Sequence, residues 1–500
     1  MLRTAPPSGA LASASPQGRS TSHFGWMTRR RAAVAVALLV GLVLRIAAAT
    51  GDLGLDEAWS LKLVTGLHSF GDVFWGLPHD NNHPLNSAWL FLIGAGRPVW
   101  LYRMPAIVFG TLTIAAVARC LGRRSEVAGI IGAWFAAVAL PLVDFGSEAR
   151  GYAGLTLASV LAIDAWDRVV AAPPWSRPSL YRRARRDLGL AIGFGALSHL
   201  GMMLTVSVLG AATLIHMGAS TRRVVTTLVG ATRLFLPCCL YLLPALTALA
   251  IGIDRGGGYK IGDIDPFSAA KLAQGLGGML TMITGLPDTI PPAVAITATL
   301  AVVATAAVRR ILAPHWTTLS LSTFVILPCV ILAAQPPNVG YARYFAVCGL
   351  VLLMIEAAAL GHLWVCSENG RRWAVAGSVA IVTGGLTLDS LQIGWGRSAA
   401  SATLALMNAE GDETYTASRP KMAALLLDAA AGRTMAGVPL SAAAFCPNPP
   451  EWYIAVGLYD PMPDAPLAVG PEQCRTTYRA RRPFASSPLS GTQWTLYRRP

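Results

Sequence analysis

The feature that most constrains this chain is a succession of long apolar runs, separated by short arginine clusters, from about residue 32 to residue 392. The hydrocarbon core of a bilayer, about 30 Å thick, needs roughly 20 apolar residues per helix, and many of the runs have this length. Hydrophobic residues make up 54% of the sequence and charged residues only 13%. This composition excludes an ordinary soluble protein and predicts an all-α polytopic membrane protein.

The arginine clusters set the predicted topology, because basic loops stay on the cytoplasmic side. The formal net charge of +14 would suggest nucleic-acid binding in a soluble chain, but here the charge lies between apolar runs. The clusters are Arg29 to Arg31, Arg123-Arg124, Arg182 to Arg186, Arg222-Arg223, Arg309-Arg310 and Arg371-Arg372. Placing them inside gives about 11–13 transmembrane helices, a cytoplasmic N-terminus and an extracytoplasmic C-terminus, which we assign to a bacterial inner (plasma) membrane.

The predicted spans follow from the same pattern. They cover about residues 32–50, 104–121, 126–143, 151–171, 188–199 with 201–217, 224–250, 290–308, 316–334, 344–363 and 373–392. The run from Leu85 to Gly96 is too short to cross easily. The stretch around Ser198-His199 is expected to join two short helices.

Composition divides the chain into three parts. Residues 1–28, rich in Ser, Ala, Pro and Thr, predict a disordered cytoplasmic tail, and residues 29–392 form the transmembrane module with a first external loop at 51–84. A signal peptide cleaved after Ala47-Ala48-Ala49 is the alternative, against which the long leading tail and Arg45 argue. Residues 393–500 have ordinary soluble composition and predict a small extracytoplasmic α/β domain.

Two cysteines, Cys446 and Cys474, lie in this last part. In an oxidising compartment they are expected to form a disulfide, and two buried thiols are the alternative. The other six cysteines lie in or beside spans without metal-ligand spacing, so we interpret them as packing residues.

Polar groups recur on the predicted outer side, each at the boundary of a span. They are Leu55-Asp56-Glu57-Ala58, His79-Asp80-Asn81-Asn82-His83-Pro84, Arg103-Met104-Pro105, Glu148-Ala149-Arg150-Gly151-Tyr152 and Tyr341-Ala342-Arg343-Tyr344-Phe345. Single charges at a membrane edge are often snorkelling anchors. A set that mixes acid, Arg, His and Tyr on one side instead suits an anionic amphiphilic substrate whose head group sits at the interface.

In this order and spacing the motifs resemble the membrane module of the GT-C glycosyltransferases, in the branch of the protein O-mannosyltransferases and the aminoarabinose transferase of lipid A. The resemblance covers the first third of the chain by motif and the middle by hydropathy, and Arg343-Tyr344 resembles an Arg-Tyr element late in that module. The usual His-Pro-Pro-Leu reads His83-Pro84-Leu85-Asn86, and Trp59 stands where Tyr is frequent. These departures leave the subfamily and the sugar open.

The resemblance implies an inverting enzyme that moves a hexosyl or pentosyl group from a polyprenyl-phosphate donor in the membrane to a hydroxyl on a lipid, glycan or protein. Asp56 is expected to be the catalytic base, since an ordinary carboxylate is ionised at neutral pH. Glu57, the second catalytic candidate, could orient the acceptor, bind a metal or pair with an arginine. The soluble C-terminal part resembles no family that we can name.

The remaining candidates would bind substrate. Arg103 and Arg343, with Lys260 as a third cation, are expected to stabilise the leaving phosphate. His83 is expected to hydrogen-bond the phosphate or Asp56, with a divalent metal at His79, Asp80 and His83 as the alternative. The other candidates are Glu148 and Arg150, a membrane-edge pair that positions the first external loop, together with Tyr152 and Tyr344.

Two other classes of function remain open. A transporter or flippase for a lipid-linked sugar would also need cations beside a membrane-level cavity, but we find no internal repeat, and the motifs crowd into the first third of the chain. A purely structural assembly protein is the third possibility. The sequence shows no nucleotide-binding phosphate loop in a suitable context, and no nucleic-acid partner is expected.

Overall fold

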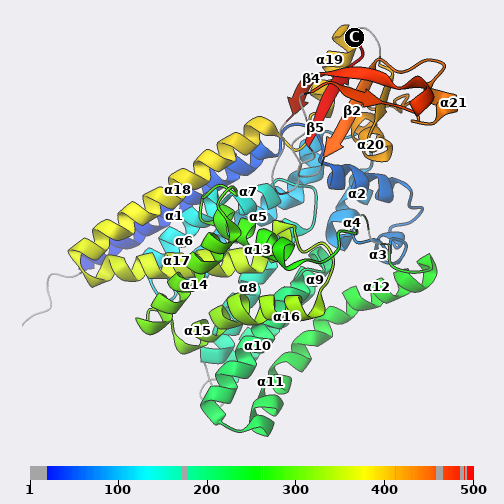
Figure 1. Ribbon diagram of the computed structural model, residues 1–500. Helices are drawn as coiled ribbons and strands as arrows, with labels where there is room; N and C mark the ends of the chain where they lie inside the picture. Colours follow the sequence, from blue (N-terminus) through cyan, green and yellow to red (C-terminus); the bar gives the residue numbers. More distant parts are fainter. Residues whose placement is uncertain are drawn as a thin grey trace, which may run out of the picture.

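The computed structural model describes residues 20–171, 178–260, 262, 264–410, 413–457, 465–484, 489 and 493–500, with the backbone alone for residues 20–30. It consists of a large helical body and a small domain with a sheet at its C-terminal end (Figure 1). Residues 1–19 of the predicted tail lie outside the described part. The first helix begins at Ser20, earlier than the sequence predicts, because a helix extends readily into the sequence that precedes its apolar run.

The elements of the body are helices. They are α1 (Ser20–Ala48), α2 (Leu55–Thr65), α3 (Asp72–Trp75), α4 (Pro84–Ile93), α5 (Val99–Gly122), α6 (Glu126–Val138), α7 (Leu140–Phe145), α8 (Tyr152–Ala171), α9 (Pro178–Ser198), α10 (Met202–Thr221), α11 (Val224–Cys239), η1 (Leu240–Leu242), α12 (Leu243–Gly256), α13 (Ala269–Ile283), α14 (Pro292–Val308), α15 (Pro314–Leu321), η2 (Ser322–Ile326), α16 (Leu327–Ala334), η3 (Ala342–Phe345), α17 (Ala346–Cys366) and α18 (Glu368–Trp395).

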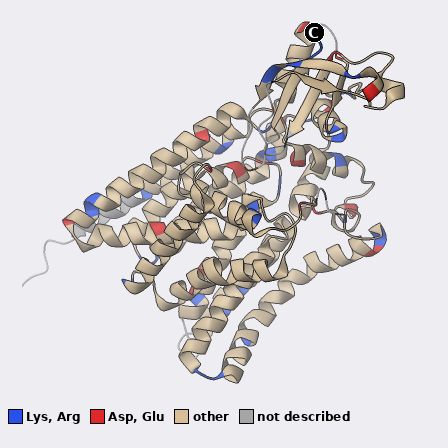
Figure 2. Cartoon of the chain, viewed as in Figure 1, with Lys and Arg blue, Asp and Glu red and all other residues tan. Residues whose placement is uncertain are grey.

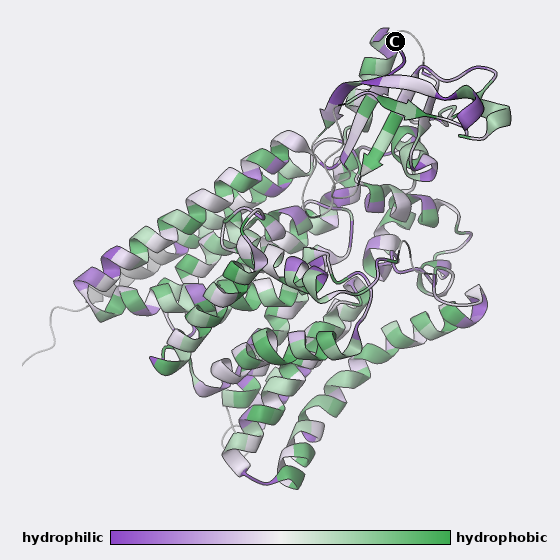
Figure 3. Ribbon diagram, viewed as in Figure 1, coloured by the Kyte–Doolittle hydropathy of each residue, from purple (hydrophilic) through white to green (hydrophobic). Residues whose placement is uncertain are grey.

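Seven helical segments of the described chain are long and apolar enough to cross a membrane. They are Arg31–Ala48, Val99–Gly122, Met202–Thr221, Val224–Gly256, Pro314–Ala334, Ala342–Cys366 and Glu368–Glu410. Four further predicted spans correspond to α6, α8, α9 and α14, which are shorter or carry more charges. The chain is therefore a multi-pass membrane protein, and Figure 3 shows apolar residues along the helices of its body.

Helix α13 is not among the predicted spans. Glycine, Thr and Gln residues lower its hydropathy, so the sequence indicates an external loop there. In the structure α13 instead buries Leu276, Met279 and Leu280 in the main core and packs against α14 and α17. A helix covered by its neighbours needs only one apolar face.

Small residues allow the helices of the body to approach closely. Helix α6 buries Ala133, Ala136 and Ala137, and α17 is buried along most of its length. Gly385 of α18 lies against the backbone of Val138, where a Cβ atom would sit 2.3 Å from the carbonyl oxygen. Such contacts drive helix association in lipid, where apolar burial alone gives little gain.

The C-terminal domain combines helices with one mixed sheet. Its elements are α19 (Ala400–Glu410), β1 (Tyr415–Ala417), α20 (Pro420–Ala431), α21 (Ala442–Phe445), β2 (Trp452–Gly457), β3 (Leu467–Val469), η4 (Glu472–Cys474), β4 (Thr476–Phe484) and β5 (Gln493–Arg498). The strand order is β1-β2-β5-β4-β3. Strands β1 and β2 are parallel and the other pairs antiparallel, so the predicted small domain is a sheet with helices.

This domain packs directly on residues 51–84, which the sequence predicts to form the first external loop. Helix α20 contacts α2, and Leu426 and Trp452 share one buried cluster with Leu53, Ala58 and Tyr102. Charged residues lie mostly at helix ends and on the C-terminal domain (Figure 2). The domain and the loop therefore form one continuous structure above the helical body (Figure 1).

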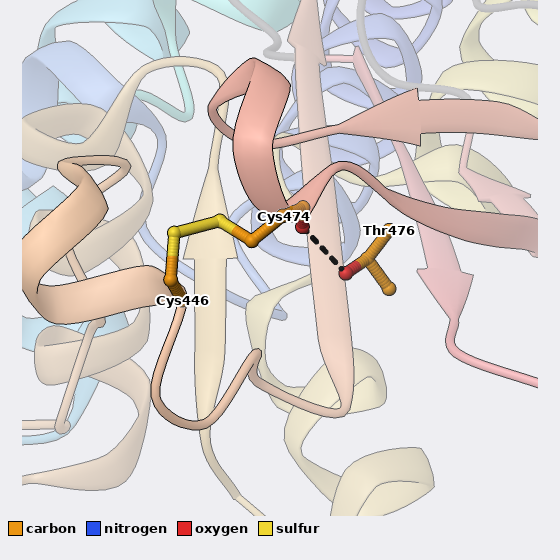
Figure 4. The surroundings of a disulfide bond; sticks show 3 residues. All are labelled: Cys446, Cys474 and Thr476. Atoms are coloured by element: carbon orange, nitrogen blue, oxygen red, sulfur yellow. Dashed lines mark hydrogen bonds between the residues drawn. A yellow bond between two sulfur atoms is a disulfide. The ribbon is translucent and has the colours of Figure 1, made fainter.

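A disulfide bond joins Cys446 to Cys474 in this domain (Figure 4). Their Cα atoms lie 5.4 Å apart and the bond spans 28 residues of sequence. The Thr476 hydroxyl donates a hydrogen bond of 3.2 Å to the Cys474 carbonyl. The bond therefore links the segment before β2 to the turn before β4.

Removing this disulfide should loosen the C-terminal domain without unfolding the helical body. Closing a loop of this length lowers the entropy of the unfolded chain, and its loss should cost about 3–4 kcal/mol. We expect Cys446→Ala/Cys474→Ala to be cleaved by protease within residues 413–500 faster than wild type, as measured by limited proteolysis. The control is Cys329→Ala, which removes an exposed free thiol. Equal cleavage rates for all three proteins would contradict the prediction.

Candidate active site

A cavity of about 430 Å³ lies beneath the C-terminal domain, where residues 51–84 meet the helical body. Its walls come from seven separate stretches of the sequence. The lining residues used below are Asp56, Trp59, His79, Asp80, Asn81, His83, Arg150, Tyr152, His199, Tyr259, Asn338, Tyr341, Arg343, Tyr344 and Met422.

Asp56 occupies the first turn of α2, where the positive end of the helix dipole favours a carboxylate. Its Oδ2 atom accepts hydrogen bonds of 2.8 Å from Nη1 of both Arg150 and Arg343. The Asp56 side chain is 28% exposed, so it is still open to the cavity. Burial alone would raise its pKa, but the two arginines outweigh this effect and hold the pKa below its ordinary value of 3.8.

A hydrogen-bond network fixes Arg150. Its Nη2 donates to Asn81 Oδ1 at 2.8 Å, and Asn81 in turn donates to the Asp56 carbonyl at 2.8 Å and the Ser60 hydroxyl at 2.9 Å. The guanidinium also lies 5.1 Å from the centre of the Tyr152 ring. Arg150 is thus held on both sides, and its orientation toward Asp56 is set before any ligand binds.

Arg343 comes from the short 3₁₀ turn η3 that precedes α17. Its guanidinium packs on two aromatic rings, 5.1 Å from Tyr341 and 5.8 Å from Tyr344. Both rings line the cavity. The turn therefore presents a cation and two aromatic faces at the same opening.

Three rings pack together in the wall of the cavity. His83 lies 4.5 Å from His199 between ring centres, and Tyr152 lies 4.2 Å from His199. Burial, with His199 and the two arginines nearby, lowers the pKa of His83 well below 6.5, and burial lowers the pKa of His199 to about 3. Both rings are neutral near pH 7. Nε2 of His83 has no hydrogen-bond partner within the described chain.

Gly151 explains how these rings come together. A Cβ atom on Gly151 would lie 1.8 Å from the Ser198 carbonyl oxygen and 3.1 Å from Cβ of His83. Only glycine fits between the start of α8, the end of α9 and the residue that precedes α4. The Arg150-Gly151-Tyr152 motif thus brings a cation and a ring to the cavity on either side of a close backbone contact.

Glu57 does not face the cavity. Its carboxylate is buried and bonds Arg103 at 2.8 Å and 2.6 Å, the Ala149 amide at 2.6 Å and the Gly54 amide at 2.7 Å. Burial would raise its pKa, but Arg103 outweighs this effect and lowers it. Adjacent helical residues point in different directions, so Asp56 and Glu57 have different surroundings.

Arg103 also lies away from the cavity, contrary to the substrate-binding role expected from the sequence. Its side chain is fully buried and donates to the carbonyl oxygens of Ala49 at 3.0 Å and Asp52 at 2.7 Å as well as to Glu57. These partners lie in the loop after α1 and in the first turn of α2, so Arg103 holds that loop in place. Its geometry is that of a structural arginine.

Glu148 and Lys260 lie beside the cavity without lining it. Glu148 is buried 3.7 Å from Arg150, and burial, together with Asp144 and Glu57, raises its pKa. Lys260 is exposed; its backbone bonds Pro78 at 2.7 Å and Asp80 at 3.0 Å, while its neighbour Tyr259 reaches the cavity.

The metal alternative rests on His79, Asp80 and His83. His79 pairs with Asp80 at 2.7 Å, whereas His83 stacks on His199. Within the described residues no group of three His, Cys, Asp or Glu side chains is arranged to hold a metal ion.

Sequence reasoning did not assign roles to several cavity residues. They are Asn81, His199, Tyr259, Asn338, Tyr341 and Met422. Asn81 and Tyr341 lie within recognised motifs, so their proximity could have been inferred. His199 and Met422 carry no local signal, because only the tertiary fold brings them to this place.

Neither a protein-family model nor a curated protein matches the sequence. The structure resembles crystal structures of ArnT from Cupriavidus metallidurans, in the apo state and bound to undecaprenyl phosphate. The apo structure gives a TM-score of 0.53 at 13% identity and covers 91% of this chain and 98% of that one. The bound structure gives 0.50 at 14% identity, with 91% and 97% covered.

An oligosaccharyltransferase of Archaeoglobus fulgidus, tethered to an acceptor peptide, gives a TM-score of 0.47 at 13% identity and covers 81% of this chain and 63% of that one. The ArnT structures match nearly the whole of both chains. This chain has the GT-C fold. The resemblance expected from the sequence motifs is confirmed at the level of the fold.

The burial of Arg103 predicts that its loss affects folding rather than substrate binding. Arg103→Gln leaves the Glu57 carboxylate buried without its partner, which should cost about 3–5 kcal/mol. We expect a lower thermal midpoint and a lower folded yield, as measured by fluorescence-detected chromatography. The control is Arg119→Gln, because Arg119 forms a partly exposed pair with Asp164. A normal midpoint with weaker donor binding would instead support the substrate role.

Proposed function

We propose that this protein is an inverting glycosyltransferase that moves a sugar from a polyprenyl-phosphate donor to a hydroxyl acceptor. The observation that carries the proposal is Asp56, a carboxylate kept ionised between two arginines in a cavity beside the membrane helices. The GT-C fold supports it, and so does the related ArnT structure whose bound ligand is undecaprenyl phosphate.

In the proposed reaction the Asp56 carboxylate accepts the proton of the acceptor hydroxyl. The acceptor oxygen attacks the anomeric carbon, and the bond from that carbon to the phosphate oxygen breaks on the opposite face. The bonding electrons leave with the polyprenyl phosphate, so the configuration at the anomeric carbon is inverted. A carboxylate must be ionised to act as a general base. The lowered pKa of Asp56 keeps it ionised at neutral pH.

The leaving phosphate would bind Arg150 and Arg343. Both guanidinium groups bind the Asp56 carboxylate, and Arg150 also lies 3.7 Å from the buried Glu148, whose pKa is raised to about 7, so its negative charge is only partial near neutral pH. Asp80 also lines the cavity, but its carboxylate is engaged by His79. Negative charge grows on the phosphate as the anomeric bond breaks, so fixed cations stabilise the transition state more than the ground state.

Neutral rings would recognise the rest of the donor. Nε2 of His83, which has no partner in the described chain, is placed to hydrogen-bond a phosphate or sugar oxygen. Tyr152 and Tyr344 offer faces and hydroxyl groups at the same wall. We assign Lys260 to a loop beside the entrance, and Glu148 to the support of Arg150.

The acceptor would approach from the C-terminal domain, because Met422 of α20 lines the cavity together with Asp56. We place this domain on the extracytoplasmic side of a bacterial inner membrane, with the N-terminus in the cytoplasm. The arginine clusters support this orientation, since basic loops stay inside.

The base role predicts that Asp56→Asn lowers transfer by about 10²–10⁴-fold, because the amide cannot accept the proton. The assay supplies radiolabelled polyprenyl-phosphate sugars to the purified chain, with membrane extract as the source of acceptor. The control is Asp80→Asn, which removes a carboxylate of the same cavity that does not contact the two arginines.

Three outcomes count against the proposal. If the wild type transfers no label, the enzyme assignment is wrong for these donors. If Asp56→Asn transfers as well as wild type at equal folded yield, Asp56 is not the base. Movement of the labelled lipid across vesicles without transfer would favour a flippase.

The lowered pKa of Asp56 predicts that protonation of the base lowers activity only below its ordinary value of 3.8, whereas a change near pH 7 would report Glu148, whose pKa burial raises to about 7. The Asp56 carboxylate is protonated as the pH falls through its pKa, and the base is then lost. In Arg343→Gln one of the cations is missing, so the pKa of Asp56 should rise and the limb should move to higher pH. The measurement is kcat/KM against pH; an acidic limb that stays at the same pH in Arg343→Gln would contradict the prediction.

A further inference from the structure

A second cavity, of about 380 Å³, lies along α9 away from the candidate active site. Its walls are Arg182, Arg185 and Arg186 of α9 on one side and Pro237, Leu240 and Tyr241 near the junction of α11 and η1 on the other. At about 1.5 Å per residue, Arg182 lies about 24 Å along the helix from Ser198, which directly precedes His199 of the first cavity. The two cavities are separate sites.

The three arginines lie on one face of α9, and η1 packs against the same face. Arg185 and Arg186 follow Arg182 by three and four residues, and Gly189 and Gly193 continue the same stripe. A Cβ atom on Gly189 would lie 2.5 Å from the Tyr241 ring, and one on Gly193 would lie 2.7 Å from the Tyr241 carbonyl oxygen. The glycines therefore admit η1 close to α9, and the arginines form the wall beside it.

The charge of this wall is only partly balanced. Asp187 lies 3.6 Å from Arg186 but also pairs with Arg168 at 3.0 Å. Arg185 stacks 5.8 Å from the Tyr181 ring and donates to the Arg233 carbonyl at 3.4 Å. Asp187 thus pairs with one of the three arginines and is shared with Arg168, and no carboxylate of the described residues lines the cavity, so the cavity keeps a net positive charge.

Exposed leucines lie at and beside the cavity: Leu240 is in its wall, and Leu236 lies one turn earlier on α11. Leu240 is 58% exposed and Leu236 is 61% exposed, on a segment long and apolar enough to cross a membrane. Leucines exposed there face acyl chains, while the arginines beside them can reach the head-group region. An inorganic anion would use only the arginines, whereas an anionic lipid would use both parts of the site.

We propose that this cavity binds the phosphate of an anionic phospholipid, with the arginine face of α9 around the head group and the exposed leucines along the acyl chains. The site takes a structural lipid of the surrounding bilayer and does not depend on the proposed transferase reaction. Bound lipid would bridge α9 and the junction of α11 and η1 at a place where protein side chains leave space between them.

The test compares two variants that remove the same charge. Arg182→Gln/Arg186→Gln removes two exposed cations of the cavity, and Arg183→Gln/Arg222→Gln removes two exposed cations that do not line it. Binding of short-chain phosphatidylglycerol to the full chain in a neutral detergent is measured by native mass spectrometry. We expect the first variant to bind about 30-fold more weakly than wild type, from the usual contribution of an arginine near anionic lipid. The second variant should bind as wild type does.

Two further arms identify the ligand. Phosphatidylcholine of equal chain length should bind weakly to the wild type, and Leu240→Gln should weaken phosphatidylglycerol binding while leaving every arginine in place. Equal weakening in both double variants, or none in the first, would overturn the proposal. Binding of inorganic phosphate with the same affinity as phosphatidylglycerol would overturn the assignment to a lipid.

Discussion

The buried ion pair between Glu57 and Arg103 determines how the candidate active site is built. Both side chains are fully buried, and such charges are tolerated only when their hydrogen bonds are satisfied. Here Glu57 accepts from Arg103 and from the amides of Gly54 and Ala149. The pair joins α2, α5 and the segment before α8 at one point. With Glu57 held inward, the preceding residue, Asp56, faces the cavity.

The charge balance around Asp56 depends on the whole helical body. Its two arginine partners lie 94 and 287 residues further along the chain, on the segment before α8 and the turn before α17. Helices α5, α6, α8 and α17 pack against one another, which sets the separation of those two segments. A packing fault far from the cavity would thus move a cation and change the pKa of Asp56. Rigid placement suits a site that acts through fixed charges.

Motif order in the sequence predicted the GT-C fold and the grouping of Asp56, His83, Arg150 and Arg343, because these residues lie at the boundaries of strongly apolar helices. Their chemical roles remain predictions. The resemblance singled out Asp56 as the base but left the role of Glu57 open, since the direction of each carboxylate is decided by a distant partner. Arg103 was predicted to bind substrate because the sequence does not reveal that its partner, Glu57, points into the protein. His199 could not be found, because its place beside His83 depends on how α9 and α10 meet the residue that precedes α4.

The C-terminal domain is tied to the membrane part by a second buried cation. Arg397 donates to the carbonyl of Ala48 at 2.8 Å and pairs with Asp144 at 2.8 Å, and so holds the chain after α18 against the ends of α1 and α7. This anchor, together with the apolar contact of α20 and α2, fixes Met422 over the cavity. In the proposed reaction the helical body then binds the donor, and the C-terminal domain borders the space that the acceptor must enter. Changes of sequence in α20 could therefore alter the choice of acceptor while the charges around Asp56 stay the same.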